Sequence, residues 1–151
     1  MAVATSKRRR SLKRRMARWE VAVAEDLRVI TRPSRTFQGQ CYRRALSFVL
    51  ALDPPHNAAA VLVHGWLDDG LLPHAWVELW GGMVFDGVMQ RFYGREAYYS
   101  VLQARKDHSY TCQEVARLSL ATVNYGPWTD AERGLVHVGN PPPEPCGLVC
   151  R

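Results

Sequence analysis

The sequence predicts a mixed α+β fold in which one helix packs on a small antiparallel sheet, with further helices on its flanks. Strand-like runs follow one another between residues 59 and 88, separated only by short turn signals. A run with helical spacing of apolar residues lies immediately before them, and others follow. With 151 residues and 47% hydrophobic composition, the chain is large enough to bury one core of ordinary size.

The N-terminal segment is basic. Apolar residues from Leu12 to Leu27 recur at steps of three and four, which predicts an amphipathic helix over residues 11–28. The basic residues before Glu20 exceed the net charge of +6, so the remainder is slightly acidic. This arm is either a solvated tail or a surface for nucleic acid or another anionic partner. The candidate contacts are Arg8, Arg9, Arg10, Lys13, Arg14 and Arg15.

A helix is predicted over residues 41–52. It follows a connection at residues 31–40, where proline and glycine disfavour regular structure. Its apolar residues have helical spacing, and Pro54-Pro55 ends it because proline excludes the residues before it from the helix. Cys41 is therefore expected in the first turn.

Three strands are predicted after this helix, at residues 59–67, 74–80 and 83–88. Asp68-Asp69-Gly70 and Gly81-Gly82 are turn signals between them. The second and third strands are close enough to form a tight hairpin.

Further helices are predicted at residues 95–106 and 111–123, the second because a Thr-x-x-Glu capping box opens it. Valine and leucine near its start leave a strand there as an alternative. After Trp128 the chain is expected to be irregular, with a polyproline-like stretch at 140–145.

The chain thus divides into a basic arm at residues 1–30, a domain at 31–130 and a proline-rich tail at 131–151. No run approaches the roughly 18–20 apolar residues of a membrane span. Four unevenly spaced cysteines favour a reducing compartment such as the cytoplasm over a disulfide scaffold. An arginine-rich, acid-poor start is also typical of an organelle transit peptide.

Cys41, His74 and Asp86 could form a nucleophilic site. A cysteine nucleophile needs a lowered thiol pKa, a base within hydrogen-bond reach and a group that orients the base. The positive end of the helix dipole favours the thiolate of Cys41. A turn at Gly81-Gly82 makes His74 and Asp86 diagonal neighbours on paired strands, where a small bulge would bring both side chains to one face.

The pattern around these residues resembles the transglutaminase-like superfamily. The matching segments are Gly39-Gln40-Cys41 at the head of a helix, then His74-Ala75-Trp76-Val77-Glu78, then Gly82-Met83-Val84-Phe85-Asp86. The resemblance spans residues 37–92 and is strongest to small bacterial and phage members, including peptidases that remove leader segments from lasso-peptide precursors.

The resemblance implies a papain-like core and mechanism. Cys41 would attack an amide carbonyl, His74 would shuttle the proton and Asp86 would orient His74. Gln38 or Gln40, with the backbone N–H of Cys41, would stabilise the oxyanion. The family often continues the aspartate into Pro-Thr, whereas this chain has Gly87-Val88.

Other interpretations of the same residues stay open. Cys41 could be an inert buried thiol, and the three residues are also competent zinc ligands, although their spacing is not that of paired metal ligands. Cys112, near another predicted helix start, is a rival nucleophile, and His64 lies on a strand that could neighbour His74. The sequence indicates no organic cofactor or metal.

We therefore expect a cysteine hydrolase or acyl transferase that acts on an amide bond of a peptide or protein. The alternative is a noncatalytic module of the same fold that binds nucleic acid or a protein partner through its basic arm.

Overall fold

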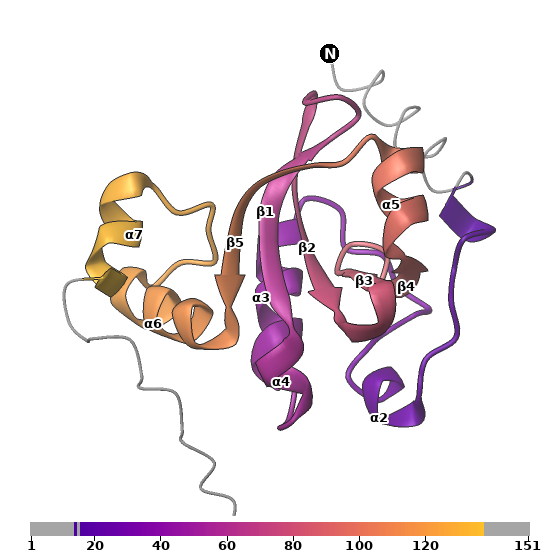
Figure 1. Cartoon of the computed structure of the whole chain (residues 1–151), viewed down its shortest axis with the longest axis horizontal. Coiled ribbons are helices and arrows are strands. Elements are labelled where there is room, and N and C mark those ends of the chain that lie inside the picture. Colours follow the sequence, from indigo (N-terminus) through magenta and orange to yellow (C-terminus); the bar gives the residue numbers. More distant parts are fainter. Residues whose placement is uncertain (1–13, 15, 138–151) are drawn as a thin grey trace, which may run out of the picture.

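Five antiparallel strands form one sheet at the centre of the described part of the chain. The structure is a computed structural model that describes residue 14 and residues 16–137 (Figure 1). The strand order is β4-β3-β2-β1-β5, so four strands form consecutive hairpins and β5 returns to the far edge. The strands are β1 Val61–Leu67, β2 Leu72–Leu79, β3 Met83–Asp86, β4 Arg91–Gly94 and β5 Arg105–Thr111.

Helices cover both faces of this sheet. Helix α3 packs across β2 and β1 with α6 beside it, and α5 packs on β3 and β4 from the other side. Figure 1 shows α6 and α7 at the β5 end of the sheet and α5 at the β4 end. The helices are α2 Glu25–Arg28, α3 Cys41–Ala51, α4 His56–Ala59, α5 Arg95–Leu102, α6 Cys112–Thr122 and α7 Asp130–His137, with a 3-10 turn, η1, at Trp80–Gly82.

The alternation of side chains along β2 separates the core into two clusters. Ala75, Val77 and Leu79 point to the side that carries α3, which we call the α3 face. Trp76 points to the opposite side, the α5 face, where it contacts Tyr98 of α5. All five are at most 1% exposed. Both clusters stabilise the fold, since each large apolar side chain contributes about 1.5–3 kcal/mol on burial.

The predicted α+β class and its central elements are confirmed. Helix α3 begins at Cys41 and ends three residues before Pro54-Pro55. The three predicted strands correspond to β1, β2 and β3, with ends displaced by a few residues. Thr111 caps α6, and its hydroxyl accepts a hydrogen bond from the Glu114 N–H while the Glu114 side chain accepts from the Thr111 N–H.

The helix predicted at residues 95–106 is too long. Helix α5 ends at Leu102 because Gln103 takes a left-handed conformation with φ of 50°. Strand β5 then begins at Arg105, and β4, also missed, precedes the helix. The sequence of β5 is mostly polar because the strand lies at an exposed edge of the sheet. It therefore lacks the alternation of apolar and polar residues by which a strand is predicted.

The prediction of irregular structure after Trp128 is wrong for residues 130–137, which form α7. Thr129 and Glu132 cap this helix with the same reciprocal hydrogen bonds that open α6. The signal was present in the sequence as Thr-Asp-Ala-Glu but is followed by few apolar residues. The polyproline-like stretch at 140–145 lies outside the described residues.

The N-terminal segment does not form the single helix predicted over residues 11–28. It turns at Arg18, and the N–H of Val21 donates to the Phe92 carbonyl at 2.9 Å. The carboxylate of Glu20 also pairs with Arg91 at 2.6 Å. The segment therefore follows the free edge of β4, whose backbone hydrogen-bonding groups compete with the helix.

Only one of the six basic candidates in the arm can be placed, and Arg14 is exposed. Arg8, Arg9, Arg10, Lys13 and Arg15 lie outside the described residues. Within the described ranges, no helix is long and apolar enough to cross a membrane.

Gly65 on β1 should be intolerant of any side chain. A Cβ there would lie 2.2 Å from the Arg105 carbonyl oxygen and 2.8 Å from the Trp76 ring. We expect Gly65→Ala to lower the free energy of unfolding by about 2–3 kcal/mol, as overpacking does. Gly134→Ala in α7 meets open space and should raise it by up to about 1 kcal/mol. Urea denaturation of both variants measures the difference, and equal stabilities would contradict the packing around Gly65.

Candidate active site

Cys41 lies at the first turn of α3, beside the part of β2 that carries His74. Gly39, with φ of 74°, turns the preceding loop, and the Gln40 carbonyl accepts the first helical hydrogen bond, from the Arg44 N–H. The sulfur accepts hydrogen bonds from the N–H groups of Tyr42 and Ala75. It is thus held by the helix start and by β2, beyond the end of the β2–β3 pairing.

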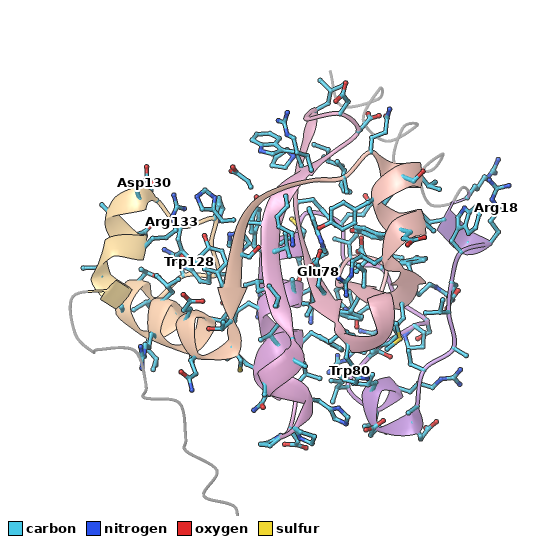
Figure 2. The ribbon with its side chains drawn as sticks, viewed as in Figure 1. Arg18, Glu78, Trp80, Trp128, Asp130 and Arg133 are labelled. Atoms are coloured by element: carbon cyan, nitrogen blue, oxygen red, sulfur yellow. The ribbon has the colours of Figure 1, made fainter. Side chains whose placement is uncertain are left out.

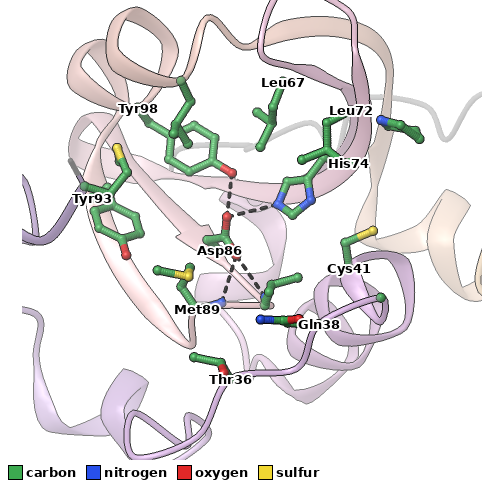
Figure 3. A pocket seen from close by; sticks show the side chains of 15 residues that line it. Thr36, Gln38, Cys41, Leu67, Leu72, His74, Asp86, Met89, Tyr93 and Tyr98 are labelled. Carbon is green, nitrogen blue, oxygen red and sulfur yellow. Dashed lines mark hydrogen bonds and ion pairs between the residues drawn. The ribbon is translucent and has the colours of Figure 1, made fainter. Parts of the chain in front are cut away.

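His74 connects Cys41 to Asp86. The residue is 6% exposed, and Nε2 lies 3.0 Å from Oδ2 of Asp86. The imidazole also forms a hydrogen bond with the Cys41 thiol, which lies on the side of the ring away from Asp86, so Nδ1 faces the sulfur (Figure 3). The three predicted catalytic residues are therefore brought together in one hydrogen-bonded chain.

The register of the β2–β3 hairpin places His74 and Asp86 on the same face. Val77 pairs with Phe85 and Leu79 with Met83, one residue away from the register expected for a turn at Gly81-Gly82 alone. The extra residue in the turn is Trp80, because η1 spans Trp80–Gly82. Continuing this register sets Asp86 opposite Trp76, which lies two positions after His74. Residues two positions apart on a strand point to the same face, so His74 and Asp86 do so too. No bulge in this hairpin is needed, contrary to the expectation from the sequence.

Asp86 has both carboxylate oxygens fully engaged. Oδ2 accepts from His74 and from the Tyr98 hydroxyl at 2.8 Å, while Oδ1 accepts from the N–H groups of Val88 at 2.9 Å and Met89 at 3.0 Å. These four donors fix the carboxylate and keep it ionised although it is only 3% exposed.

Gly87 explains the departure from an Asp-Pro-Thr sequence after the aspartate. A Cβ at this position would lie 2.7 Å from Cβ of Arg44 and 2.9 Å from the Ala45 nitrogen. The loop after Asp86 therefore packs directly on the backbone of α3, and glycine permits that approach.

Electrostatics favour a charged Cys41–His74 pair. Burial raises the pKa of Cys41, but the hydrogen bond and positive charge of His74 outweigh it, so the pKa lies below its ordinary value. Burial lowers the pKa of His74, but the charge and hydrogen bond of Asp86 raise it to about 10. Burial likewise raises the pKa of Asp86, yet His74 holds it below the usual range. Together these shifts favour a thiolate beside an imidazolium.

The two oxyanion candidates occupy different places. Gln38 lines a cavity of about 130 Å³ that opens beside Cys41 (Figure 3). Gln40 does not line it, and its side-chain oxygen instead accepts a hydrogen bond from Nε of Arg44 at 3.2 Å. The geometry therefore favours Gln38 for contact with a bound substrate.

The other candidate residues lie away from Cys41, His74 and Asp86. Cys112 opens α6 on the α3 face, where its sulfur lies 4.0 Å from the Val49 carbonyl oxygen. His64 is buried on the α3 face, although β1 is the neighbour of β2. No cluster of three or more potential metal ligands occurs within residues 16–137.

Several residues of the site carried no signal in the sequence. Tyr98 reaches Asp86 from α5, and Met16, Met89 and Tyr93 line the cavity. They come from four separate segments, and only the sheet register and the packing of α5 bring them together. Glu78 of the matching segment does not line the cavity, since it accepts hydrogen bonds from Tyr99 and Lys106.

Comparisons with known proteins identify no relative. No model of a protein family matches the chain, and neither a curated protein nor a solved structure does.

His64 should make the fold sensitive to acid. Its ring packs between Tyr42, Tyr110 and Trp128, and both ring nitrogens are buried without a hydrogen-bond partner in the described chain. Trp128 lies between α7 and β5 (Figure 2). Burial, with electrostatic repulsion from His108 and Arg133, lowers the pKa of His64 to about 3.

Because the folded pKa of His64 lies below the unfolded value of about 6.5, its contribution to stability is present above pH 6.5 and is lost as the pH falls toward 3. Between pH 7 and pH 4.5 we expect this histidine to remove about 2–3 kcal/mol from the free energy of unfolding. Urea denaturation at both pH values should show a smaller loss in His64→Phe. The same loss in both proteins would contradict a neutral, buried His64.

Proposed function

We propose that the protein is a cysteine hydrolase or acyl transferase that acts on amide bonds, with a fold of transglutaminase-like type. One observation carries the proposal: Cys41, His74 and Asp86 form a continuous hydrogen-bonded chain whose sulfur end opens on a cavity. A nucleophile, a base and an orienting carboxylate in this order are what acyl transfer through a thioester needs.

The geometry supports a stepwise mechanism. The Cys41 thiolate attacks the amide carbonyl, and the resulting oxyanion accepts hydrogen bonds from the Cys41 N–H and the Gln38 side chain. His74 gives its Nδ1 proton to the amide nitrogen, the C–N bond breaks, and the amine leaves a thioester on Cys41. Water or a second amine then attacks the thioester, His74 accepts its proton, and the sulfur leaves as the thiolate. Asp86 stabilises the imidazolium throughout.

The transglutaminase-like assignment is supported by element order. A helix headed by the cysteine precedes two antiparallel strands, and the histidine and aspartate lie on those strands in the order that the resemblance implies. The resemblance to small bacterial and phage peptidases suggests that the substrate is a peptide and that the enzyme is cytoplasmic.

Peptide turnover tests the proposed reaction. The full chain is incubated with a proteome-derived peptide mixture, with and without a primary amine, and new termini or amine adducts are identified by mass spectrometry. We expect products from the unaltered protein and from Cys112→Ala, which removes the rival thiol, and none from Cys41→Ala. Identical products from Cys41→Ala would refute the mechanism.

A second candidate function is binding of an anionic partner, and a series of arginines without acidic partners favours it. Residues 27–52 contain five arginines and no acidic residue. None of the five takes part in an ion pair within the described chain. They are Arg28, Arg32, Arg35, Arg43 and Arg44.

Salt dependence tests this second function. Affinity for a fluorescent single-stranded oligonucleotide is measured at 50 and 200 mM salt, since neutralising several phosphates makes binding fall steeply with salt. Deletion of residues 2–13 removes most of the basic arm but keeps Met16, which is 2% exposed and needed in the core. Salt-dependent binding that survives this deletion supports contact through the five arginines, binding that is lost assigns the contact to the basic arm, and the absence of binding to the full chain counts against the second function.

A further inference from the structure

The cavity beside Cys41 is a pocket on the α5 face of the sheet. Figure 3 shows Cys41 and His74 at one side of it and Tyr93 at the other, with Asp86 between them. Its volume of about 130 Å³ is comparable to that of an engineered protein cavity of about 150 Å³ that binds benzene. One substrate side chain of medium size therefore fits. The walls are mainly apolar, formed by Met16, Leu67, Leu72, Pro73, Val88, Met89 and Leu102.

The pocket offers no free charge to a ligand. Its charged groups are the Cys41 thiolate, the His74 imidazolium and the Asp86 carboxylate, and His74 lies between the other two, 3.0 Å from Asp86. The remaining acceptor positions of Asp86 are used by Tyr98, Val88 and Met89. A charged side chain in the pocket would therefore lose its hydration without gaining a partner, which is strongly unfavourable.

One buried polar group in the wall is left without a partner. Tyr93 is 1% exposed, and its buried hydroxyl makes no hydrogen bond within residues 16–137. Figure 3 shows this hydroxyl directed toward Met89, across the pocket from Cys41. Buried hydroxyls are nearly always hydrogen-bonded in folded proteins, so this one is available to a ligand that reaches it.

We infer that this pocket selects one side chain of the substrate, next to the scissile amide, that is uncharged, of medium size, and carries a hydrogen-bonding group at the end of an apolar or flat body. The inference rests on the proposed function for its link to catalysis. The apolar walls bind the body of the side chain, and the Tyr93 hydroxyl binds its tip. An analogue without the tip would bind more weakly because it leaves the protein hydroxyl unpaired.

Binding to the Cys41→Ala protein tests the pocket apart from the reaction. The probes are N-acetyl amino-acid methylamides in matched pairs, tyrosine against phenylalanine and asparagine against leucine, with aspartate as the charged match of asparagine. NMR chemical-shift titration gives each dissociation constant. We expect the tyrosine and asparagine probes to bind about two- to tenfold more tightly than their apolar matches, the range of one net hydrogen bond. The aspartate probe should bind at least about tenfold more weakly than the asparagine probe.

Two variants decide which hydroxyl is responsible. Tyr93→Phe should abolish the preference within each pair, while Tyr110→Phe should keep it, since Tyr110 is also a buried tyrosine but lies outside the pocket on the α3 face. Equal affinities within the pairs in the Cys41→Ala protein, or a preference that survives Tyr93→Phe, would overturn the inference.

The outcome for the pocket is separable from that for the reaction. Selective binding by Cys41→Ala, together with no turnover by the unaltered protein, would keep the pocket and reject the proposed function. Turnover by the unaltered protein without the predicted binding preference would keep the proposed function and reject the pocket.

Discussion

Cys41 should react with iodoacetamide at pH 6 roughly 10- to 100-fold faster than glutathione does. A free thiol with a pKa near 8.5 is almost wholly protonated at this pH, whereas the His74 imidazolium favours the Cys41 thiolate. The gain is smaller than the thiolate fraction alone implies, because nucleophilicity falls with pKa. Labelling is followed for each cysteine by mass spectrometry between pH 5 and 9.

The pH profile distinguishes an ion pair from an ordinary thiol. The thiolate and imidazolium coexist above the lowered pKa of Cys41 and below that of His74, near 10, so the labelling rate should reach its plateau at a lower pH than the rate of an ordinary thiol. In His74→Ala the rate should be low at pH 6 and rise about tenfold per pH unit toward the thiol pKa. Cys112 is the internal control, since His74→Ala should leave its labelling unchanged. A Cys41 profile in the unaltered protein that coincides with the profile in His74→Ala would reject the activated pair.

Asp86→Asn should slow Cys41 labelling at pH 6 by about tenfold or more, because it removes the negative charge that raises the pKa of His74 and so weakens the imidazolium that stabilises the thiolate. The hydrogen bonds predict a tautomer change as well. The N–H groups of Val88 and Met89 would retain the asparagine oxygen, so its NH₂ group would face His74 Nε2. Nε2 must then accept, the proton moves to Nδ1, and the neutral ring can no longer take a proton from Cys41 there.

Tyr98→Phe is the matched control for Asp86→Asn. It removes one neutral donor from Oδ2 but leaves the carboxylate charge and the bond to His74. We expect it to change the labelling rate less than tenfold. ¹⁵N chemical shifts of the His74 ring should report Nδ1 protonation with a neutral ring in Asp86→Asn and a doubly protonated ring in Tyr98→Phe. An imidazolium in Asp86→Asn would contradict the role given to this carboxylate.

The sequence predicts the chemical identity of the site better than its surroundings. Cys41 could be placed because a helical pattern begins at it, and His74 and Asp86 because a glycine pair separates two apolar runs. Their common face could not be derived, since it depends on whether Trp80 belongs to the strand or to the turn. That choice is made by backbone conformation, with both glycines of η1 at positive φ.

The missed elements have local physical reasons. Strand β5 is polar because one side of it faces water, and its position depends on pairing with β1 across many intervening residues. The N-terminal segment has a helical pattern, yet Met16 and Leu27 enter different apolar clusters on opposite faces of the sheet. A single straight helix cannot serve both clusters, so tertiary contacts override the local pattern.

The reactive atoms belong to two different structural layers. Cys41 is carried by α3, whose position is set by the stacking of Phe48 on Phe85, with ring centroids 3.8 Å apart. His74 and Asp86 extend toward α5 on the other side of the sheet. Sliding of α3 over the strands would therefore misalign sulfur and imidazole while leaving both layers folded. Substitutions in the α3 layer, away from the pocket, would therefore change the alignment of the Cys41 sulfur with the His74 ring without altering either residue.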